Sequence, residues 1–470
     1  MFVGRTAELE QLNRLYNKRG FQMMVLYGRR RIGKTTLIDQ FVTDKPTLYF
    51  TAKQQSNLLN LNAFSRKVIE FFHLPPASPM FASWDDALAV VAQHAQANTI
   101  GKPFVFVFDE FPYAALADQS LPSTLQITID HGFGDTDVTM ILSGSNEGFM
   151  ESQVLGYQSP LYGRRTAQLR LRPFDYADAA LLMPNATAQD RINYYATFGG
   201  TPYYLAQIDD SLSYRDNMMD LCFNPSGLLF EEPLMLLRQE LREPALYNSI
   251  LQAIANGAST IKLIAEHSGV EYHSITKYLK TLENLFLIER QVPFGEQPTK
   301  SRKARYIIRD PFFAYWYRFV SNRTELVESG YGKEAAQQAF GPAFDTYVGQ
   351  QFETVCRQWL MRANHREALP FLATHFGKWW GNDPVAREET DIDVIAANPD
   401  TREILVGECK WRSSLNIADT IATLRSRAGL VRGYDRHHLA LFVKTDELAR
   451  VARERHEPNL TVVAADEMFE

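Results

Sequence analysis

The sequence predicts an α/β protein built from several domains. Its 470 residues are more than one hydrophobic core normally serves, which predicts about three domains. In the first half, continuous apolar runs such as "MMVLY" and "FVFVF" are typical of parallel strands that are buried on both faces. Near the C-terminal end, "DIDVIA" and "ILVGECK" predict two further strands joined by a tight turn, after a long helical region.

Composition and charge narrow the class of protein. Hydrophobic residues make up 45% and charged residues 22% of the chain, which is typical of a globular protein, and no apolar run approaches the roughly 20 residues of a membrane span. The formal net charge of −6 gives no global attraction to nucleic acid, so any such binding must come from a local patch. The start "MFVGRTAELE" lacks a signal-peptide pattern, and Cys222, Cys356 and Cys409 are too scattered for a disulfide framework or a zinc site. We therefore expect a reduced, cytoplasmic protein without membrane contact.

The strongest motif lies in "MMVLYGRRRIGKTTLIDQF". An apolar strand is followed by Gly28, four residues, Gly33, Lys34 and Thr35, and then by a helical pattern, which is the context of a phosphate-binding loop. Lys34 is expected to reach the β- and γ-phosphates of a nucleotide, and the Thr35 hydroxyl to ligate Mg²⁺. A basic turn before a helix is the alternative, which the four fixed positions disfavour. The nucleotide-binding residues expected here are Gly28, Arg31, Ile32, Gly33, Lys34, Thr35 and Thr36.

A second acidic strand accompanies the loop. The run "FVFVF" ends on Asp109 and Glu110, at the carboxyl end where ligands sit in open α/β sheets. Asp109 would hold Mg²⁺, and Glu110 would orient and polarise the water that attacks ATP. The alternative is a strand that merely ends in solvent-facing acids.

A third strand, in "VTMILSGSNEGFM", ends on polar residues. One of Ser143, Ser145 and Asn146 is placed to sense the γ-phosphate, and Ser145 is our candidate, although a simple exit from the strand would look similar. Beyond it, Arg164 or Arg165 could act as an arginine finger that stabilises transition-state charge. A solvated basic turn is the equal alternative for these arginines.

The first half of the chain resembles the archaeal-type ATPases, which are close to the STAND branch of the AAA+ superfamily. The segments "FVGRTAELEQL", "GRRRIGKTT", "FVFDEFPY", "LSGS" and "FGGTPYYL" occur in the order of that family. The resemblance implies a P-loop NTPase core with a helical lid that binds ATP. It also implies that the adenine is framed by Phe2, Val3, Gly4 and Arg5, and touched from the other side by Gly200 and Pro202 of the lid.

The middle of the chain predicts a winged helix-turn-helix. Residues 244–294 are helical in pattern, with Ser259 as the expected N-cap of the second helix and Gly269 at its end, and a hairpin follows. Such a domain either contacts DNA or packs on the ATPase lid and relays its nucleotide state. For DNA contact, the recognition helix would use His273, Thr276, Lys277 and Lys280, and the wing Lys300, Arg302, Lys303 and Arg305.

A hairpin in the C-terminal region brings charged residues together. In "TDIDVIAANPDTREILVGECKW", two strands flank the turn "NPDT", so Asp393 should lie near Glu408 and Lys410. Two carboxylates can hold Mg²⁺, and Lys410 can orient the bound water or neutralise a phosphate, which suits hydrolysis of a phosphodiester. The alternative is a surface ion pair between Glu408 and Lys410, which is worth little.

This hairpin resembles the PD-(D/E)xK nuclease superfamily with its restriction-endonuclease-like α/β fold. The resemblance implies that Glu353 is the extra acid on the first helix, whereas Asp391 stands where a glutamate is more usual. "GKWWG", "DIDVIA" and "GECKW" are also similar to an uncharacterised domain often fused behind archaeal-type ATPases. The expected domains are an ATPase core (1–172), a helical lid (173–240), a winged helix (241–310), a helical connector (311–345) and a nuclease-like domain (346–470).

Together these motifs predict an ATP-controlled switch with a nuclease-like effector. ATP and Mg²⁺ would bind to the core and lid, and hydrolysis would move the lid and winged helix and alter access to the C-terminal site. The alternative is a non-cutting ATPase that acts as a DNA-binding regulator or signalling scaffold. Oligomers are compatible with either function.

Overall fold

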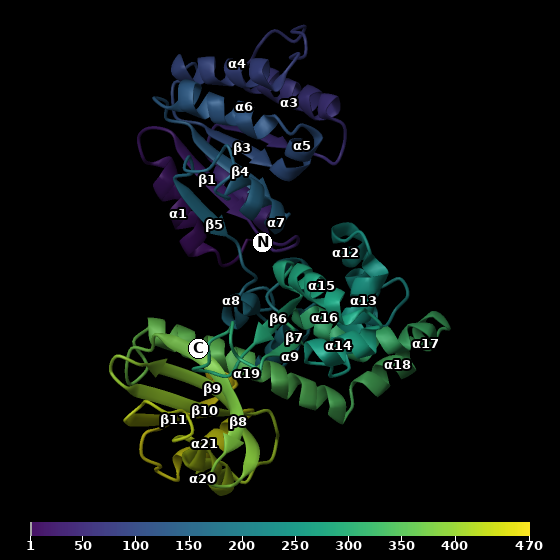
Figure 1. Cartoon of the computed structure of the whole chain (residues 1–470), viewed down its shortest axis with the longest axis vertical. Helices are drawn as coiled ribbons and strands as arrows, with labels where there is room; N and C mark the ends of the chain where they lie inside the picture. The colour runs from purple at the N-terminus through teal and green to yellow at the C-terminus, as the bar shows by residue number, and fades with distance from the viewer. Residues whose placement is uncertain (1) are drawn as a thin grey trace. The chain divides into compact units, whose positions relative to one another are not determined.

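The computed structural model describes residues 2–470 of the chain. The chain divides into two compact units, of which the first ends at Pro173 and the second comprises Phe174–Glu470. Each unit is described by itself, and Figure 1 labels its helices and strands.

The first unit contains a five-stranded parallel sheet in the order β2-β3-β4-β1-β5. Its strands are β1 (Gln22–Tyr27), β2 (Thr47–Thr51), β3 (Val105–Asp109), β4 (Thr139–Gly144) and β5 (Ala167–Arg170). Every residue of β1, β3 and β4 is buried, because helices cover both faces of the sheet. The parallel α/β core predicted from the apolar runs is thus confirmed.

Two helical layers cover this sheet (Figure 1). Its helices are α1 (Thr6–Tyr16), α2 (Lys34–Val42), α3 (Asn57–Phe71), α4 (Trp84–Gln96), α5 (Phe111–Ala117), α6 (Leu121–Thr128) and α7 (Glu147–Phe149), with π-helical turns at Ile129–Phe133 and Met150–Val154. Alternate residues of β1 face opposite layers: Met24 and Leu26 pack with α1 and α2, and Met23 and Val25 with α3, α4 and α6. Both faces of the strand are therefore apolar.

The carboxyl ends of three neighbouring strands meet at one edge of this sheet, because β4 pairs with both β1 and β3. Strand β1 ends at Tyr27, just before the phosphate loop, and β3 ends at Asp109. Strand β4 ends at Gly144, one residue before Ser145. The loop, the acidic pair and the serine are therefore gathered at the ligand-binding edge of an open α/β sheet.

The second unit begins with helices and continues into a three-helix segment with a hairpin. Its helices are α8 (Tyr176–Ala180), α9 (Ala188–Phe198), α10 (Pro202–Leu205), α11 (Tyr214–Cys222), α12 (Glu232–Glu240), α13 (Pro244–Ala255), α14 (Ile261–Ser268) and α15 (Tyr272–Asn284), followed by antiparallel strands β6 (Ile288–Gln291) and β7 (Arg305–Ile308).

Thr260 caps α14 by accepting the Leu263 N–H at 3.3 Å, so the expectation for Ser259 was wrong. The Ser259 carbonyl instead accepts the Tyr306 N–H in β7, the second strand of the hairpin. Gly269 ends α14 in a left-handed conformation, as expected.

A second, mixed sheet lies near the C-terminal end, in the order β12-β11-β10-β9-β8. Its strands are β8 (His375–Asp383), β9 (Glu388–Asn398), β10 (Glu403–Lys410), β11 (Arg436–Val443) and β12 (Leu460–Ala464). The remaining helices are α16 (Pro311–Tyr315), α17 (Thr324–Glu328), α18 (Gly332–Ala339), α19 (Pro342–His365), α20 (Ile417–Arg427) and α21 (Asp446–Arg453), with π- or 3-10-helical turns at Trp316–Val320, Ser321–Arg323 and Asp466–Phe469. Helix α20 packs Leu424 against β10, while α19 reaches β11 where Trp359 contacts Phe442. Helix α19 passes residues 345 and 346, the expected domain boundary, without interruption.

Strand β9 contains a β-bulge. Gly377 pairs with Ile395 and Trp379 pairs with Ile392, so Lys378 faces two residues of β9. As a result Ile392 and Ile395, three positions apart, pack into the same apolar cluster. Strict alternation along the strand, which the sequence pattern implied, would have placed them on opposite faces.

Two expectations concern the whole chain. None of the helices within residues 2–470 has both the length and the apolar character needed to cross a membrane. The three cysteines are buried, free thiols.

Candidate nucleotide site and candidate metal centre

The phosphate loop joins β1 to α2 and holds Lys34 in a buried position. Lys34 is 6% exposed, and its Nζ donates hydrogen bonds to the carbonyls of Gly28 (2.8 Å) and Arg29 (3.0 Å). Burial lowers the pKa of Lys34, and the negative charges of Glu110 and Asp109 oppose this effect. A buried cation that rests on carbonyls of its own loop is positioned to turn toward a phosphate.

The start of α2 is open to an anion. Gly33 precedes the helix in a left-handed conformation and supplies no side-chain cap, so the N–H groups of the first turn are left for a phosphate. Thr35 and Thr36 lie exposed in that first turn, where Thr35 could ligate Mg²⁺. Ile32 is buried and Arg31 half-buried, so Ile32 would contribute through its backbone.

The acidic pair at the end of β3 is held in place by neighbouring groups. Asp109 is 3% exposed, and burial raises the pKa of its carboxyl. Glu110 adopts a left-handed conformation (φ 50°), and its backbone N–H donates to Asp109 Oδ1 at 3.0 Å. Both the N–H and the hydroxyl of Ser145 donate to the Glu110 carboxylate, the N–H at 3.2 Å. The structure thus brings the candidates Glu110 and Ser145 together, and Ser145 fixes the Glu110 carboxylate that would polarise the attacking water.

Arg5 ties the phosphate loop to the end of the first unit. Its guanidinium donates to the carbonyls of Ile32 (3.2 Å) and Arg172 (2.6 Å) and pairs with Glu8 at 3.1 Å. The residues just before it, Phe2 to Gly4, are half-buried. Arg5 is 8% exposed, so it serves as an internal brace as well as belonging to the segment expected to frame adenine.

The two arginine-finger candidates differ in their surroundings. Arg164 makes a bidentate pair with Asp130 (2.9 and 2.7 Å), and this contact raises the pKa of the guanidinium. Arg165 is half-buried, and its positive charge acts on Tyr27 at the end of β1. Arg164 would have to leave Asp130 to serve as a finger.

Gly200 and Pro202 lie in the second unit, at the start of α10. The Gly200 carbonyl accepts the Phe174 N–H at 2.8 Å. A Cβ on Gly200 would lie 1.8 Å from the Phe174 oxygen, so only glycine fits there. Phe174, the first residue of the second unit, is therefore held against the "FGGTP" motif.

Sequence reasoning missed an ion pair beside the phosphate loop. Glu147 is 6% exposed and pairs with Arg170 of β5 at 2.7 Å. Burial raises the pKa of Glu147, while Arg170 and a backbone N–H from Arg29 oppose the rise. An acid three residues after the third strand was the signal that the sequence offered.

In the second unit, Asp393, Glu408 and Lys410 come together where the middle of β9 lies beside the end of β10. Asp393 Oδ2 accepts the N–H of Cys409, the residue between the other two, at 2.8 Å. Glu408 is 5% exposed, and Lys410 donates to its Oε1. Arg427 of α20, which sequence reasoning missed, binds Glu408 Oε2 at 3.2 Å. Two cations thus hold one buried carboxylate.

A second group of charges adjoins the first. Glu353 of α19 accepts a hydrogen bond from Lys378 Nζ at 2.6 Å, and Asp391 lies 3.6 Å from the same nitrogen. Burial raises the pKa of Glu353, with the Lys378 charge opposing it. Lys378 stands in the "GKWWG" stretch, yet nothing in that pattern marks it as a partner of Glu353.

Burial and like charge act together on Asp393. Its pKa is raised to about 7, first by burial and then by the negative charges of Glu408 and Glu353. A divalent cation would relieve this repulsion, and carboxylate oxygens are its preferred ligands. Among residues 2–470, no three His, Cys, Asp or Glu side chains form a ligand set, so a cation at Asp393 and Glu408 would retain water ligands. Two carboxylates with water in the remaining positions are a ligand set that Mg²⁺ accepts.

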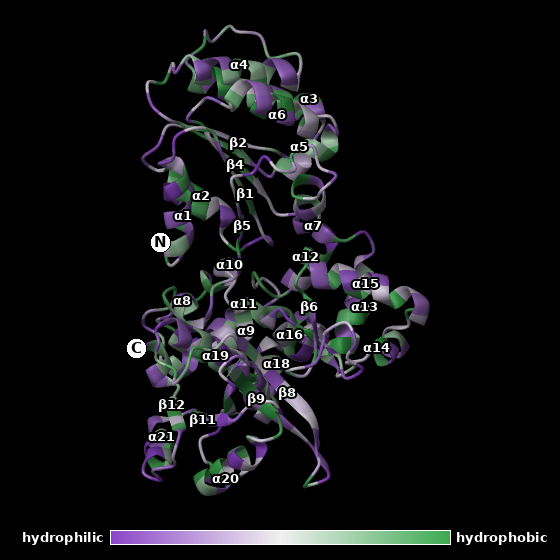
Figure 2. Ribbon diagram, turned by 60° about the vertical axis from the view of Figure 1, so that its left-hand side comes forward, coloured by the Kyte–Doolittle hydropathy of each residue, from purple (hydrophilic) through white to green (hydrophobic). Residues whose placement is uncertain are grey.

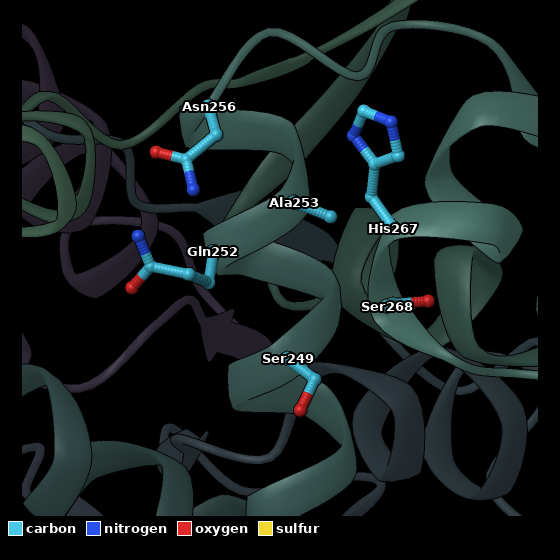
Figure 3. A pocket seen from close by; sticks show the side chains of 6 residues that line it. All are labelled: Ser249, Gln252, Ala253, Asn256, His267 and Ser268. Carbon is cyan, nitrogen blue, oxygen red and sulfur yellow. The ribbon is translucent and has the colours of Figure 1, made fainter.

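The structure also has a polar hollow between α13 and α14 (Figure 3). It is lined by Ser249, Gln252, Ala253, Asn256, His267 and Ser268. None of the candidate residues lies in it, so it is separate from both sites.

Comparisons with known proteins place the chain in a family. The sequence profile of a family described as "ATPase domain predominantly from Archaea" matches residues 2–208, and one described as "Archaea bacterial proteins of unknown function" matches residues 316–421. An uncharacterized protein of Methanocaldococcus jannaschii is 31% identical over 412 residues, covering 88% of each chain. An uncharacterized ATP-binding protein of the same organism is 51% identical over 45 residues, which are 10% of this chain and 76% of that protein.

A solved structure supports the fold. A Walker-type ATPase of Pyrococcus abyssi superposes with a TM-score of 0.51 at 19% identity, over 67% of this chain and 96% of that one. The phosphate loop, the parallel sheet and these matches lead to one conclusion. The chain belongs to the archaeal-type ATPase family, with a P-loop ATPase domain followed by a separate C-terminal α/β domain of unknown function.

Proposed function

We propose that this protein hydrolyses ATP and uses its nucleotide state to control a metal-dependent, nuclease-like C-terminal domain. The observation that carries the proposal is the convergence of Asp393, Glu408 and Lys410 beside Glu353, in an ATPase-family chain. Two buried carboxylates with an adjacent lysine are suited to phosphodiester hydrolysis.

For ATP hydrolysis, each residue has a separate role. Lys34 turns from the loop carbonyls to the β- and γ-phosphates, and Thr35 and Asp109 hold Mg²⁺. Glu110 orients and polarises the attacking water, and Ser145 sets the direction of its carboxylate. Mg²⁺ supplies charge neutralisation of the phosphates when it is bound.

For phosphodiester cleavage, Asp393 and Glu408 provide oxygen ligands for a divalent cation. The cation lowers the pKa of a bound water when it is present. Lys410 orients that water or neutralises the phosphate. Arg427 keeps Glu408 in position when Lys410 moves, since it binds the other carboxylate oxygen.

Contacts within the second unit support the coupling of the two activities. We assign α8–α12 to the helical lid of the ATPase, and Glu353 lies on α19 between side chains that bond to this lid. Those bonds run from Tyr347 Oη to the Ala196 carbonyl (2.8 Å), from Gln358 Nε2 to Tyr195 Oη (2.8 Å) and from Arg362 to Asp175 (2.6 Å). A movement of the lid would therefore displace the helix that carries Glu353.

A non-cutting ATPase that binds DNA remains the second candidate, because internal ion pairs hold Glu408, Glu353 and Asp391. We assign α13–α15 with β6 and β7 to a winged helix. Its third helix exposes His273, Thr276, Lys277 and Lys280. The hairpin is engaged within the unit, where Arg305 lies over the Trp380 ring at 5.2 Å.

A cleavage assay with metal titration tests the proposal. Purified protein is incubated with plasmid and Mg²⁺ or Mn²⁺, with and without ATP. Asp393→Ala and Glu408→Ala should each weaken metal binding and abolish cleavage, because each removes an oxygen ligand. Lys410→Ala should abolish cleavage and leave metal binding largely intact, since an ammonium is not a ligand. Lys444→Ala, a lysine over the Trp411 ring, is the matched control and should cleave normally.

ATP hydrolysis should continue in all these variants, because the phosphate loop is in the other unit. If no cleavage occurs with either metal while ATP is hydrolysed, the non-cutting candidate holds. If neither carboxylate variant changes metal affinity, Glu408 and Lys410 are an ordinary ion pair.

A further inference from the structure

Lys378 occupies an unusual position in the C-terminal sheet. It is the single residue of β8 opposite the bulge of β9, and bulges are over-represented next to active sites. Its backbone carbonyl accepts the Phe294 N–H at 2.8 Å, from the loop that follows β6. The neighbouring Gly377 permits this approach, because a Cβ there would lie 2.7 Å from the Phe294 ring. The backbone around Lys378 is therefore held by the pairing of β8 with β9 and by the hydrogen bond from Phe294.

The ammonium of Lys378 lies among carboxylates. It is 2.6 Å from Glu353 and 3.6 Å from Asp391, and the charge of Asp393 also acts on it. The side chain is 28% exposed, so its pairing with Glu353 is only partly screened by water. Glu353 and Asp391 come from α19 and β9, and Lys378 joins them.

The charges around Lys378 determine whether a second metal ion can bind there. Four carboxylates, those of Glu353, Asp391, Asp393 and Glu408, meet three cations in the cluster. Two-metal sites hold their ions about 3.5–4 Å apart, and each ion needs oxygen ligands of its own. Glu353 and Asp391 would be the ligands of a second ion, but the Lys378 ammonium already lies 2.6 Å and 3.6 Å from them and offsets one of their two negative charges. Its displacement would leave an unpaired, partly buried ammonium, which is costly.

We propose that Lys378 is a built-in cation that takes the place of a second divalent metal ion, so that the centre binds one ion, at Asp393 and Glu408. This inference rests on the metal centre of the proposed function. A covalently attached ammonium keeps Glu353 in a fixed orientation whether or not metal is present. Because this ammonium is part of the chain, the nuclease-like site binds one metal ion and not two.

Counting bound Mn²⁺ tests the proposal without any activity measurement. Full-length protein without nucleotide is titrated with Mn²⁺ and free ion is followed by electron paramagnetic resonance. Ions of the C-terminal centre are those lost when Asp393→Ala and Glu353→Gln are introduced together into the same background. Wild type should hold one such ion. Lys378→Met, which keeps an unbranched side chain one atom shorter and removes its charge, should hold two.

Three further variants make the count specific. The double variant Lys378→Met/Glu353→Gln should return to one ion, because the second ion needs the Glu353 carboxylate. Lys378→Arg keeps the cation and should hold one ion, and the control Lys444→Met should match wild type. Melting temperatures show which variants are folded. If Lys378→Met does not fold, the two single variants Lys378→Arg and Glu353→Gln still test the proposal, because each should hold one ion.

Two results would overturn the inference: two ions in wild type, or one ion of unchanged affinity in folded Lys378→Met. Loss of a second ion in Glu353→Gln would overturn it as well. If wild type holds no ion at this centre, the metal centre of the proposed function fails and the inference fails with it. One ion without plasmid cleavage removes the nuclease activity and leaves the inference standing.

Discussion

Replacing Asp393 with asparagine should stabilise the metal-free protein at neutral pH. The folded protein holds the pKa of Asp393 at about 7, against an ordinary value of 3.8, because the carboxyl is buried beside other negative charges. The folded state therefore binds this proton more tightly than the unfolded state. Stability from this group is full below about pH 4, falls as pH rises and is lost above about pH 7.

The size of the effect follows from the difference between the two pKa values. Each pKa unit corresponds to about 1.4 kcal/mol, so full ionisation costs at most about 4 kcal/mol of folding free energy. Asparagine carries no charge and keeps an oxygen to accept the Cys409 N–H. Between pH 5 and pH 8, wild type should lose about 2.5 kcal/mol more stability than Asp393→Asn.

Urea unfolding in EDTA at several pH values measures this difference. Every other titrating group is shared, so the two stability curves should converge near pH 4 and separate as pH rises. Curves that stay parallel from pH 5 to pH 8 would refute the reasoning, since they would mean that Asp393 is ionised without cost. The same variant should bind Mn²⁺ far more weakly, so the gain in stability comes with loss of the metal centre.

Three further predictions concern the ATPase and the lid. Lys34→Ala removes the ammonium expected on the phosphates, so ATP affinity by calorimetry and phosphate release should both collapse while the far-ultraviolet spectrum is retained. Glu110→Gln should still bind ATP and hydrolyse it at least about 100-fold more slowly, whereas Ser145→Ala, which frees the Glu110 carboxylate, should lower turnover without changing ATP affinity. Gly200→Ala should destabilise the second unit by at least about 3 kcal/mol in urea unfolding, because the new Cβ would lie 1.8 Å from the Phe174 oxygen.

Each of these predictions has an outcome that contradicts it. Unchanged ATP binding in Lys34→Ala would exclude the assigned phosphate loop, and wild-type turnover in Glu110→Gln would mean that another residue handles the water. Gly429 has open space around its Cα, so Gly429→Ala is the matched control and should change stability by no more than about 0.5 kcal/mol. Equal stability of the two glycine variants would mean that the close contact between Gly200 and Phe174 does not form.

Local patterns were sufficient to predict much of this protein. The strand–loop–helix motif around Lys34 and the apolar runs predicted the parallel sheet, because buried strands and glycine-rich turns leave short-range signatures. The same kind of pattern predicted the hairpin that brings Asp393 to Glu408, since the turn "NPDT" fixes which strand residues face each other. The roles assigned to these residues stay predictions until the variants are measured.

Long-range partners were decided only by the tertiary structure. Side-chain alternation says which face a residue occupies, but it does not say which distant residue meets it there. The sequence therefore could not show that Arg427 shares Glu408 with Lys410, that Ser145 holds Glu110, or that α19 bonds to α8 and α9. The bulge in β9 is the clearest case. One extra residue in β9 shifts the alternation of that strand opposite Lys378, and that shift depends on strand pairing, which no run of residues records.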